Sequence, residues 1–180
     1  MLERSLTAGA ELQPLEPWQA AEFAAFADRH RDHLRPWLPW AEIVVDEDSA
    51  RAFLQRYADR QAADDGRIYG IRLDGDLVGG TLFRIFEPGA GVCEIGVWLA
   101  PDAQGRGLIT SAARHMIDWA VRVRGMHRVE WRNAPENTRS SAVAQRLGMQ
   151  RDGILREAFV HLGRRQDVEV WSVLAHEWQS

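Results

Sequence analysis

The sequence predicts a single α+β domain over residues 1–180, with a mixed, mainly antiparallel central sheet flanked by helices. Three strand-like segments follow one another between 67 and 99 with short turns between them, which favours an antiparallel meander. Helix-like and strand-like segments then alternate from 105 to 174, which favours a crossover between parallel strands. No repeat, low-complexity tract or Pro/Ser-rich linker divides the chain.

Two helices are expected before the meander. The segment 17–35 carries apolar residues along a helical pattern and ends at Pro36, which cannot continue a helix. A second helix is expected from about 46 to 63, because its acidic first residues complement the positive start of a helix. The run 64–66, Asp-Asp-Gly, ends it.

The meander consists of three predicted strands. The first, 67–73, alternates polar and apolar residues, and Asp74-Gly75-Asp76 is typical of a tight hairpin turn. Strand 77–86 follows, and the Pro- and Gly-containing turn 87–91 leads into strand 92–99. Strands joined by such short turns pair antiparallel.

The second half changes period. Apolar residues recur at helical spacing from 105 to 124, and Gly125 ends that helix. Strand, helix, strand and strand are then expected at 127–132, 138–147, 149–156 and 167–174. The strand–helix–strand order predicts a right-handed crossover and one parallel pair within the sheet.

Composition narrows the class of protein. A net charge of −4 and a pI near 5.9 argue against a general nucleic-acid binder. No apolar run approaches the roughly 20 residues that span a membrane, and 1–10 lacks the pattern of a secretory signal. Cys93 is the only cysteine, so no intrachain disulfide can form. We therefore expect a cytoplasmic protein with no membrane partner.

The turn Gln104-Gly105-Arg106-Gly107 lies between a strand and a long helix. The start of a helix carries free backbone N–H groups and a partial positive charge, and glycines allow an anion to approach them closely. Arg106 adds a full charge, although a plain glycine-rich helix cap would have the same sequence. The dinucleotide fingerprint would need a third glycine, and a P-loop would need Gly-Lys-Ser/Thr, so neither is present.

The same stretch resembles motif A of the GNAT acetyltransferases, Gln/Arg-x-x-Gly-x-Gly/Ala, with Gln104, Gly107 and Ile109 at the three defined positions. Ile109 departs from the usual small residue. Four further segments resemble the bacterial ribosomal-protein N-terminal acetyltransferases of the Rim type. They are HLRPWLPW at 33–40, EIGVWL at 94–99, NTRSSAVAQRLGM at 137–149, and the closing strand 163–170 with Asp167.

This resemblance implies a GNAT-like fold and a bound acyl-CoA, most simply acetyl-CoA. Its pyrophosphate would lie on the amides from Gly105 to Thr110, and its pantetheine arm would pair with the strand at 97–99. Asn137 would reach the arm from the other side, a role compatible with capping the helix that follows. The expected cofactor-binding residues are Val97, Trp98, Leu99, Gln104, Gly105, Arg106, Gly107, Leu108, Ile109, Thr110 and Asn137.

Amide formation from a thioester requires a neutral amine, so some group must accept a proton. Glu94 is on the same strand face as Trp98 and occupies the place where many GNAT enzymes carry a general base; a carboxylate paired with an arginine is the alternative. In Rim-type enzymes a Ser begins the last helix, and Ser140 matches it as a proton donor or as a cap. Their Glu on the following strand is replaced by Phe159, but Glu157 would share its face in a regular strand. The predicted base is Glu94 or Glu157.

Other site chemistries have little support in the sequence. His30 and His33 are three residues apart, but no further ligand cluster accompanies them, so no metal is expected. There is no G-x-S-x-G motif, and Cys93 has no evident histidine partner, which argues against a nucleophilic hydrolase.

The acceptor is less well defined. The family resemblance implies a protein N-terminal α-amine, whose pKa of about 7.7–8.0 makes it easier to deprotonate than a lysine near 10.4. Small amines, including antibiotics, longer acyl donors and a non-catalytic CoA-binding module are the alternatives. The segment 37–40 and the helices before it are expected to line the acceptor side, and the resemblance also suggests a homodimer.

Overall fold

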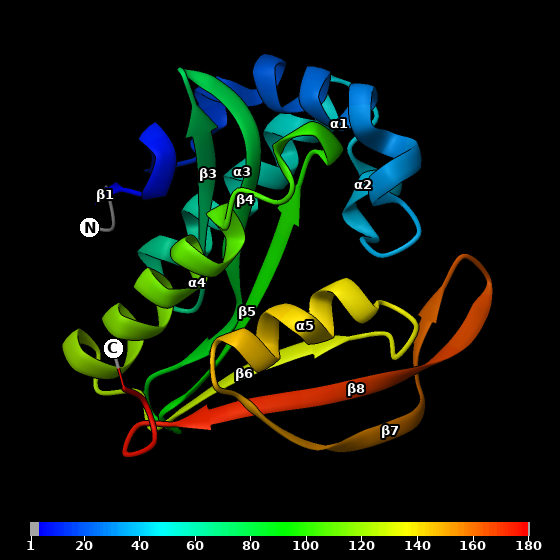
Figure 1. Cartoon of the computed structure of the whole chain (residues 1–180). Coiled ribbons are helices and arrows are strands. Elements are labelled where there is room, and N and C mark those ends of the chain that lie inside the picture. The colour runs from blue at the N-terminus through cyan, green and yellow to red at the C-terminus, as the bar shows by residue number, and fades with distance from the viewer. Residues whose placement is uncertain (1–3, 180) are drawn as a thin grey trace.

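The computed structural model describes residues 4–179 and has the predicted α+β architecture, with one sheet and helices on both of its faces (Figure 1). In the described residues the sheet has eight strands, in the order β1-β2-β3-β4-β5-β6-β8-β7. The strands are β1 (Arg4–Ser5), β2 (Ala10–Pro14), β3 (Arg67–Leu73), β4 (Asp76–Glu87), β5 (Val92–Leu99), β6 (Arg128–Asn133), β7 (Gln150–His161) and β8 (Arg164–Leu174). The helices are α1 (Ala20–Leu34), α2 (Trp40–Ile43), α3 (Glu47–Ala62), α4 (Leu108–Asp118) and α5 (Thr138–Arg146). Short helical turns are η1 (Thr7–Gly9), η2 (Pro17–Gln19), η3 (Pro101–Ala103) and the π-helical η4 (Trp119–Val123).

The predicted meander is confirmed: β3, β4 and β5 pair antiparallel in succession. One parallel pair is present, as predicted, but it is formed by β5 and β6, which α4 connects. The strands on either side of α5, β6 and β7, are not paired, because β8 lies between them. Strands β1 and β2 and helix α2 were not anticipated. Pro14 and Pro17 weigh against a strand in a sequence pattern, yet β2 pairs with β3 along its whole length.

The C-terminal strands are longer than expected. β7 and β8 form a hairpin whose two-residue loop, Leu162-Gly163, has positive φ at both positions, as a type I′ turn requires. Residues 157–166 therefore belong to strands and a turn rather than to a loop. Most of β7 is exposed on both faces, so its sequence lacks the alternation by which a half-buried strand is recognised.

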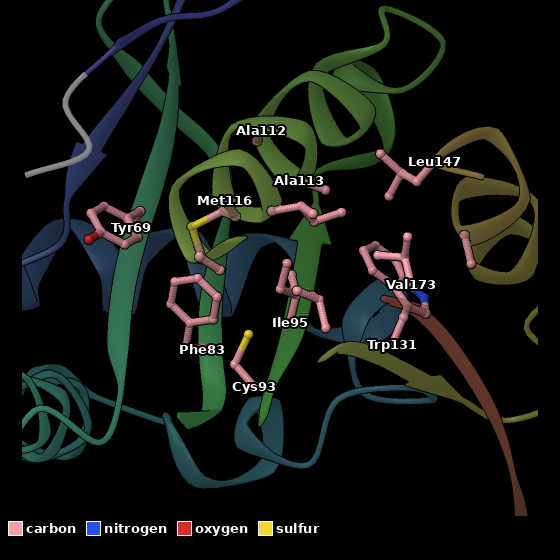
Figure 2. Packing of buried hydrophobic residues seen from close by; sticks show 14 of the residues in the cluster. Tyr69, Phe83, Cys93, Ile95, Ala112, Ala113, Met116, Trp131, Leu147 and Val173 are labelled. Carbon is pink, nitrogen blue, oxygen red and sulfur yellow. The ribbon is translucent and has the colours of Figure 1, made fainter. Parts of the chain in front are cut away.

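Two apolar clusters, one on each face of the sheet, hold the helices in place. On one face, α4 and α5 pack on the sheet, and Figure 2 shows Met116 of α4 beside Phe83 and Ile95, with Trp131 nearby. On the other face, α1, α2 and α3 pack around Phe23 and the inner residues of β3 to β5. Within residues 4–179, no helix is both long and apolar enough to cross a membrane.

Candidate active site

Strands β5 and β6 separate part-way along their length. They are paired from Val92 with Arg128 to Ile95 with Trp131, and β5 then continues through Gly96 to Leu99 without a β6 partner. Figure 1 shows the two strands diverging, with α5 over β6 and the start of α4 near the end of β5. The sheet is therefore open between the ends of β5 and β6.

The open edge of β5 presents backbone hydrogen-bonding groups. Gly96 turns its carbonyl toward β4, where the hydroxyl of Thr81 donates to it at 3.0 Å. Ala100 also points toward β4, donating its N–H to a β4 carbonyl at 2.8 Å. Because successive residues of a strand turn their backbone polar groups to opposite edges, those of Val97 and Leu99 point away from β4. An extended ligand chain could pair with them as an added strand.

This opening is part of a groove of about 1230 Å³. The groove runs between β5 and β6, along the start of α4 and α5, and past α3, the segment 33–43 and the β7–β8 hairpin. Its wall combines apolar side chains such as Trp40 and Leu82 with arginines and two carboxylates, Glu94 and Asp167. A cavity of this size, with a few convergent polar groups, suits a cofactor-sized ligand together with an acceptor.

One end of the groove is formed by the glycine turn. Gly105 and Gly107 have φ of +78° and +73°, left-handed values that cost most other residues about 1 kcal/mol or more. Because of this geometry α4 begins at Leu108, whereas the sequence pattern predicts a helix from residue 105. The first helical hydrogen bond runs from Ser111 to Gly107, so the N–H groups of 108–110 have no partner within the helix. These amides and the positive end of α4 form a site suited to an anion.

Gln104 connects two sides of the groove. Its side-chain nitrogen lies 3.1 Å from Nε2 of His33 in α1, and its oxygen accepts a hydrogen bond of 3.1 Å from Arg139 in α5. The same residue begins the glycine turn. Gln104 therefore fixes that turn relative to the helices on both sides of it.

Glu94 projects into the groove from the middle of β5 and forms an ion pair with Arg84. It is buried, and both of its carboxylate oxygens accept hydrogen bonds from Arg84, while Arg132 lies 3.6 Å away. The hydrogen bonds to Glu94 raise the pKa of Arg84. Glu94 shares its strand face with Gly96 and Trp98, as predicted, because Trp98 packs with the α1–α3 cluster whereas Ile95 packs with the α4 cluster.

A β-bulge brings Arg84 to this position. Strand β4 pairs Ile85 with Glu94 and then Phe83 with Ile95, so Arg84 is an extra residue opposite Glu94. In a regular ladder Arg84 would oppose Ile95, on the face covered by α4. Bulges commonly redirect a side chain beside an active site, and here the bulge turns a guanidinium into the groove.

Ser140 and Asn137 are at the start of α5, on the opposite wall. The Asn137 side chain accepts a hydrogen bond of 3.2 Å from the Ser140 amide, so it caps the helix, and both residues line the groove. The Ser140 hydroxyl accepts a hydrogen bond of 2.8 Å from the indole of Trp131. An indole N–H can only donate, so the hydroxyl proton of Ser140 remains available to a ligand.

The expectation that Glu157 shares a face with Phe159 is wrong, because β7 is not regular there. After Leu155 pairs with Val168, the next pair is Phe159 with Gln166, so three residues of β7 oppose a single residue of β8. Glu157 has φ of +50° within this bulge, and its backbone N–H donates to Asp167 at 2.8 Å. Phe159 lines the groove and Glu157 does not.

The thiol of Cys93 is no nucleophile in this fold. Burial, followed by the nearby carboxylates of Glu130 and Glu94, raises the pKa of Cys93 to about 12. The side chain is completely buried in the α4 cluster. Within the described range 4–179, no three His, Cys, Asp or Glu side chains are close enough to hold a metal ion.

Comparison with known proteins decides the family. A model of the GNAT acetyltransferase domain matches residues 12–150. The chain belongs to the GNAT acetyltransferase family. It is 30% identical to Bacillus subtilis YdaF, over 92% of this chain and 91% of that protein, whose name assigns ribosomal N-acetylation provisionally. It is 26% identical to the Escherichia coli ribosomal-protein-serine acetyltransferase, over 72% of this chain and 73% of that protein. RimL, a ribosomal L7/L12 α-N-protein acetyltransferase solved with coenzyme A, has the same fold, with a TM-score of 0.90, 20% identity, and 96% and 97% of the two chains covered.

Most of the residues predicted to contact the donor in this GNAT enzyme lie along the one groove. Arg106 is the exception: it is exposed and does not line the groove. The predicted site residues that line the groove are Val97, Trp98, Leu99, Gln104, Gly105, Gly107, Leu108, Ile109, Thr110, Asn137, Ser140 and Glu94.

Sequence reasoning missed the basic residues of the GNAT site. The sequence pattern places Arg84 only in a strand and Arg56 only in a helix, yet both line the groove, together with Tyr57. The spacing of Arg56 and Arg60, one helical turn apart on either side of a buried tyrosine, is the one signal in the sequence that could have indicated them.

Proposed function

We propose that this enzyme transfers the acetyl group of acetyl-CoA to the N-terminal α-amine of a protein, by direct attack of the amine on the thioester. One observation carries the proposal. The free edge of β5 leads from the unpaired amides at the start of α4 to a groove section where Glu94 and Ser140 come from opposite walls. A donor bound along that edge would have its phosphates at one end and its thioester near both side chains.

Coenzyme A fits this groove by its chemistry. The amides of 108–110 suit the pyrophosphate, and the outward groups of Val97 and Leu99 suit the amide-containing pantetheine arm. Asn137 is close enough to the groove to contact the arm while it caps α5. RimL was solved with coenzyme A, and the microcin C7 self-immunity acetyltransferase MccE, of similar fold, was solved with acetyl-CoA; both support the same class of donor.

In the proposed reaction Glu94 receives the proton of the attacking amine. Both of its oxygens already accept from Arg84, so we propose that a water molecule relays the proton to a remaining lone pair. The amine nitrogen bonds to the thioester carbon, and the carbon–sulfur bond then breaks. Ser140 donates its hydroxyl proton to the departing thiolate, because Trp131 leaves that proton free. Solvent then returns a proton to Ser140 and accepts the proton held by Glu94, which restores both side chains.

Glu157 is the second candidate for the base, and it has less support. Its backbone lies in the β7 bulge, and its side chain is not among those that line the groove. A role for Glu157 would require the hairpin to move when the acceptor binds.

The proposed acceptor is a ribosomal protein, because named relatives from Bacillus subtilis and Escherichia coli carry that activity in their names. Intact-mass spectrometry of ribosomal proteins, from cells with and without the gene, tests this directly. We expect one protein to lose 42 mass units, one acetyl group, in cells lacking the gene, and to regain it when the gene is restored. Identical masses in both strains would contradict the ribosomal acceptor.

We also propose that the enzyme works in the cytoplasm as a homodimer. The cytoplasmic assignment is supported by the ribosomal acceptors of the named relatives and by the single, buried Cys93. The dimer is supported by the sheet edge at β7, where Ile154, Leu155 and Val160 are exposed apolar residues. Light scattering at several concentrations would give twice the chain mass if this is correct, and the chain mass if it is not.

A further inference from the structure

Three arginines and the buried Tyr57 line the groove wall formed by α3 and β4. Arg56 and Arg60 lie on α3 on either side of Tyr57, and Arg84 comes from the β4 bulge. The Arg60 guanidinium lies over the Tyr57 ring, 5.3 Å from its centre. Burial raises the pKa of Tyr57, and the charges of Arg60, Arg56 and Arg84 oppose that shift. We call Arg56, Arg60 and Arg84 the α3 arginine cluster.

The groove is cationic although the chain as a whole is acidic. The net charge of the chain is −4, yet six arginines line the groove against two carboxylates, Glu94 and Asp167. A cleft with charge opposite to that of the whole protein concentrates ligands of the complementary sign. Part of this positive charge, Arg139 and Arg146 on α5, is on the wall that reaches the glycine turn and suits the phosphates of the donor.

The α3 arginine cluster is too far away to serve those phosphates. Arg84 is bonded to Glu94, which is five residues before the end of β5 at Leu99. At about 3.3 Å per residue this places the pair roughly 17 Å from the end of the strand, after which the glycine turn begins. A donor with its pyrophosphate on the turn therefore leaves the cluster to the acceptor.

One guanidinium of the cluster is not neutralised by the protein. Arg84 is paired with Glu94, and Arg60 with Asp65. Within the described part of the chain Arg56 forms no ion pair; it lies over the ring of Phe53, 5.1 Å from its centre, and is exposed. The acceptor end of the groove thus keeps one guanidinium without an ion-pair partner, beside an apolar floor that includes Trp40 and Trp98.

We infer that the acceptor is an acidic peptide N-terminus, with a carboxylate on its second or third residue that pairs with Arg56. This inference rests on the proposed function and names the class of acceptor for it. The amine would enter beside Glu94, and the acidic side chain would reach the α3 arginine cluster. A guanidinium and a carboxylate form charge-assisted hydrogen bonds, which are about twice as strong as neutral ones.

Paired peptides test the inference. Each pair has the same N-terminal residue and length and carries glutamate or glutamine at positions two and three, and kcat/KM is measured by thiol release from acetyl-CoA. We expect the acidic peptide to be preferred about tenfold or more, which corresponds to about 1.4 kcal/mol. The preference should shrink as salt is raised, because the cluster is partly exposed.

Variants at position 56 assign the preference to one side chain. Arg56→Gln should bring the ratio of acidic to neutral kcat/KM close to one, and Arg56→Lys should retain part of it. Arg51→Gln is the matched control, because Arg51 is also an exposed arginine of α3, but is paired with Glu47 and does not line the groove. It should keep the full ratio.

The outcomes separate this inference from the proposed function. Equal kcat/KM for both peptides of each pair would overturn the acidic acceptor alone, as would a preference that survives in Arg56→Gln. The α-amide of glutamic acid, a small amine that carries a carboxylate, is measured as a comparison substrate. If its kcat/KM equals that of the acidic peptide, the assignment of a peptide acceptor is overturned. Turnover of no peptide at all would overturn the proposed function and this inference with it.

Discussion

The two members of the Arg84–Glu94 pair should respond differently to removal. In Glu94→Gln the carboxylate is lost and Arg84 remains; in Arg84→Gln the carboxylate remains without its bidentate partner. Their environments differ, since the side chain of Glu94 is 6% exposed and that of Arg84 is 52% exposed. If Glu94 is the general base, Glu94→Gln should be the more stable of the two variants and also the less active one.

The expected magnitudes follow from these exposures. A half-exposed arginine without its partner is hydrated, so Glu94→Gln should lower the free energy of unfolding by about 1 kcal/mol or less. Arg84→Gln leaves a buried charge, which costs about 3–5 kcal/mol, and the low end applies because Arg132 lies 3.6 Å away. For a chain of this length, about 3 kcal/mol corresponds to a fall in Tm of roughly 6–12 °C, against about 4 °C or less for Glu94→Gln.

Thermal unfolding and initial rates of thiol release give both numbers from the same preparations. Glu94→Gln should lower kcat/KM about 10²-fold or more, the usual contribution of a general base. Arg84→Gln should keep more activity, measured well below its Tm, because the carboxylate is still present. Near-normal turnover of Glu94→Gln at neutral pH would remove Glu94 from the role. Equal Tm values for the two variants would contradict the burial argument.

Three further outcomes are expected. Gly107→Val should weaken acetyl-CoA binding at least about tenfold by calorimetry, because a β-branched residue resists φ of +73°, whereas Gly125→Val, at a similar φ of +67° beyond the other end of the helix, should not. Ser140→Ala should lower kcat with little change in acetyl-CoA affinity, and Ser141→Ala, whose hydroxyl instead donates to a buried carboxylate of β8, should leave kcat nearly unchanged; equal losses of kcat would contradict the proton-donor role. Hydrogen bonds from two arginines lower the pKa of Asp64 from 3.8 to about 2, so its stabilising contribution is complete above pH 4 and is lost as pH falls toward 2. Acid unfolding of Asp64→Asn should lack that part of the pH dependence; an identical profile would contradict the shift.

Much of the fold could be predicted from the sequence because its signals are local. The meander is marked by alternation and by turn residues, and α4 by apolar residues three and four apart, such as Ala112, Ala113 and Met116. Strands β1 and β2 and the tip of the β7–β8 hairpin depend on pairing with distant or exposed partners, so no local pattern indicates them. The apolar periodicity predicts a start of α4 three residues too early, because positive φ at Gly105 and Gly107 cannot be read from a periodicity.

The site was predictable wherever it depends on strand alternation. Alternation placed Glu94 and Trp98 on one face, and the strand–turn–helix order placed the glycine turn at the start of α4. The positions of Arg84 and Glu157 could not be predicted, because each depends on a β-bulge. A one-residue shift in β4 moved Arg84 to the face of Glu94, and a larger bulge in β7 separated Glu157 from Phe159. A bulge depends on how two strands pack together, so the sequence of one strand does not reveal it.

Acetyl transfer to a peptide N-terminus tests the central claim most directly. The purified chain is mixed with acetyl-CoA and two copies of one acidic peptide, one with a free α-amine and one with that amine already blocked, each containing an internal lysine. Mass spectrometry with fragmentation locates any added acetyl group. We expect one acetyl group on the α-amine of the free peptide, matched by stoichiometric thiol release, and none on the blocked peptide. Acetylation of the lysine in both peptides, or thiol release that is the same without peptide, would contradict the proposed activity.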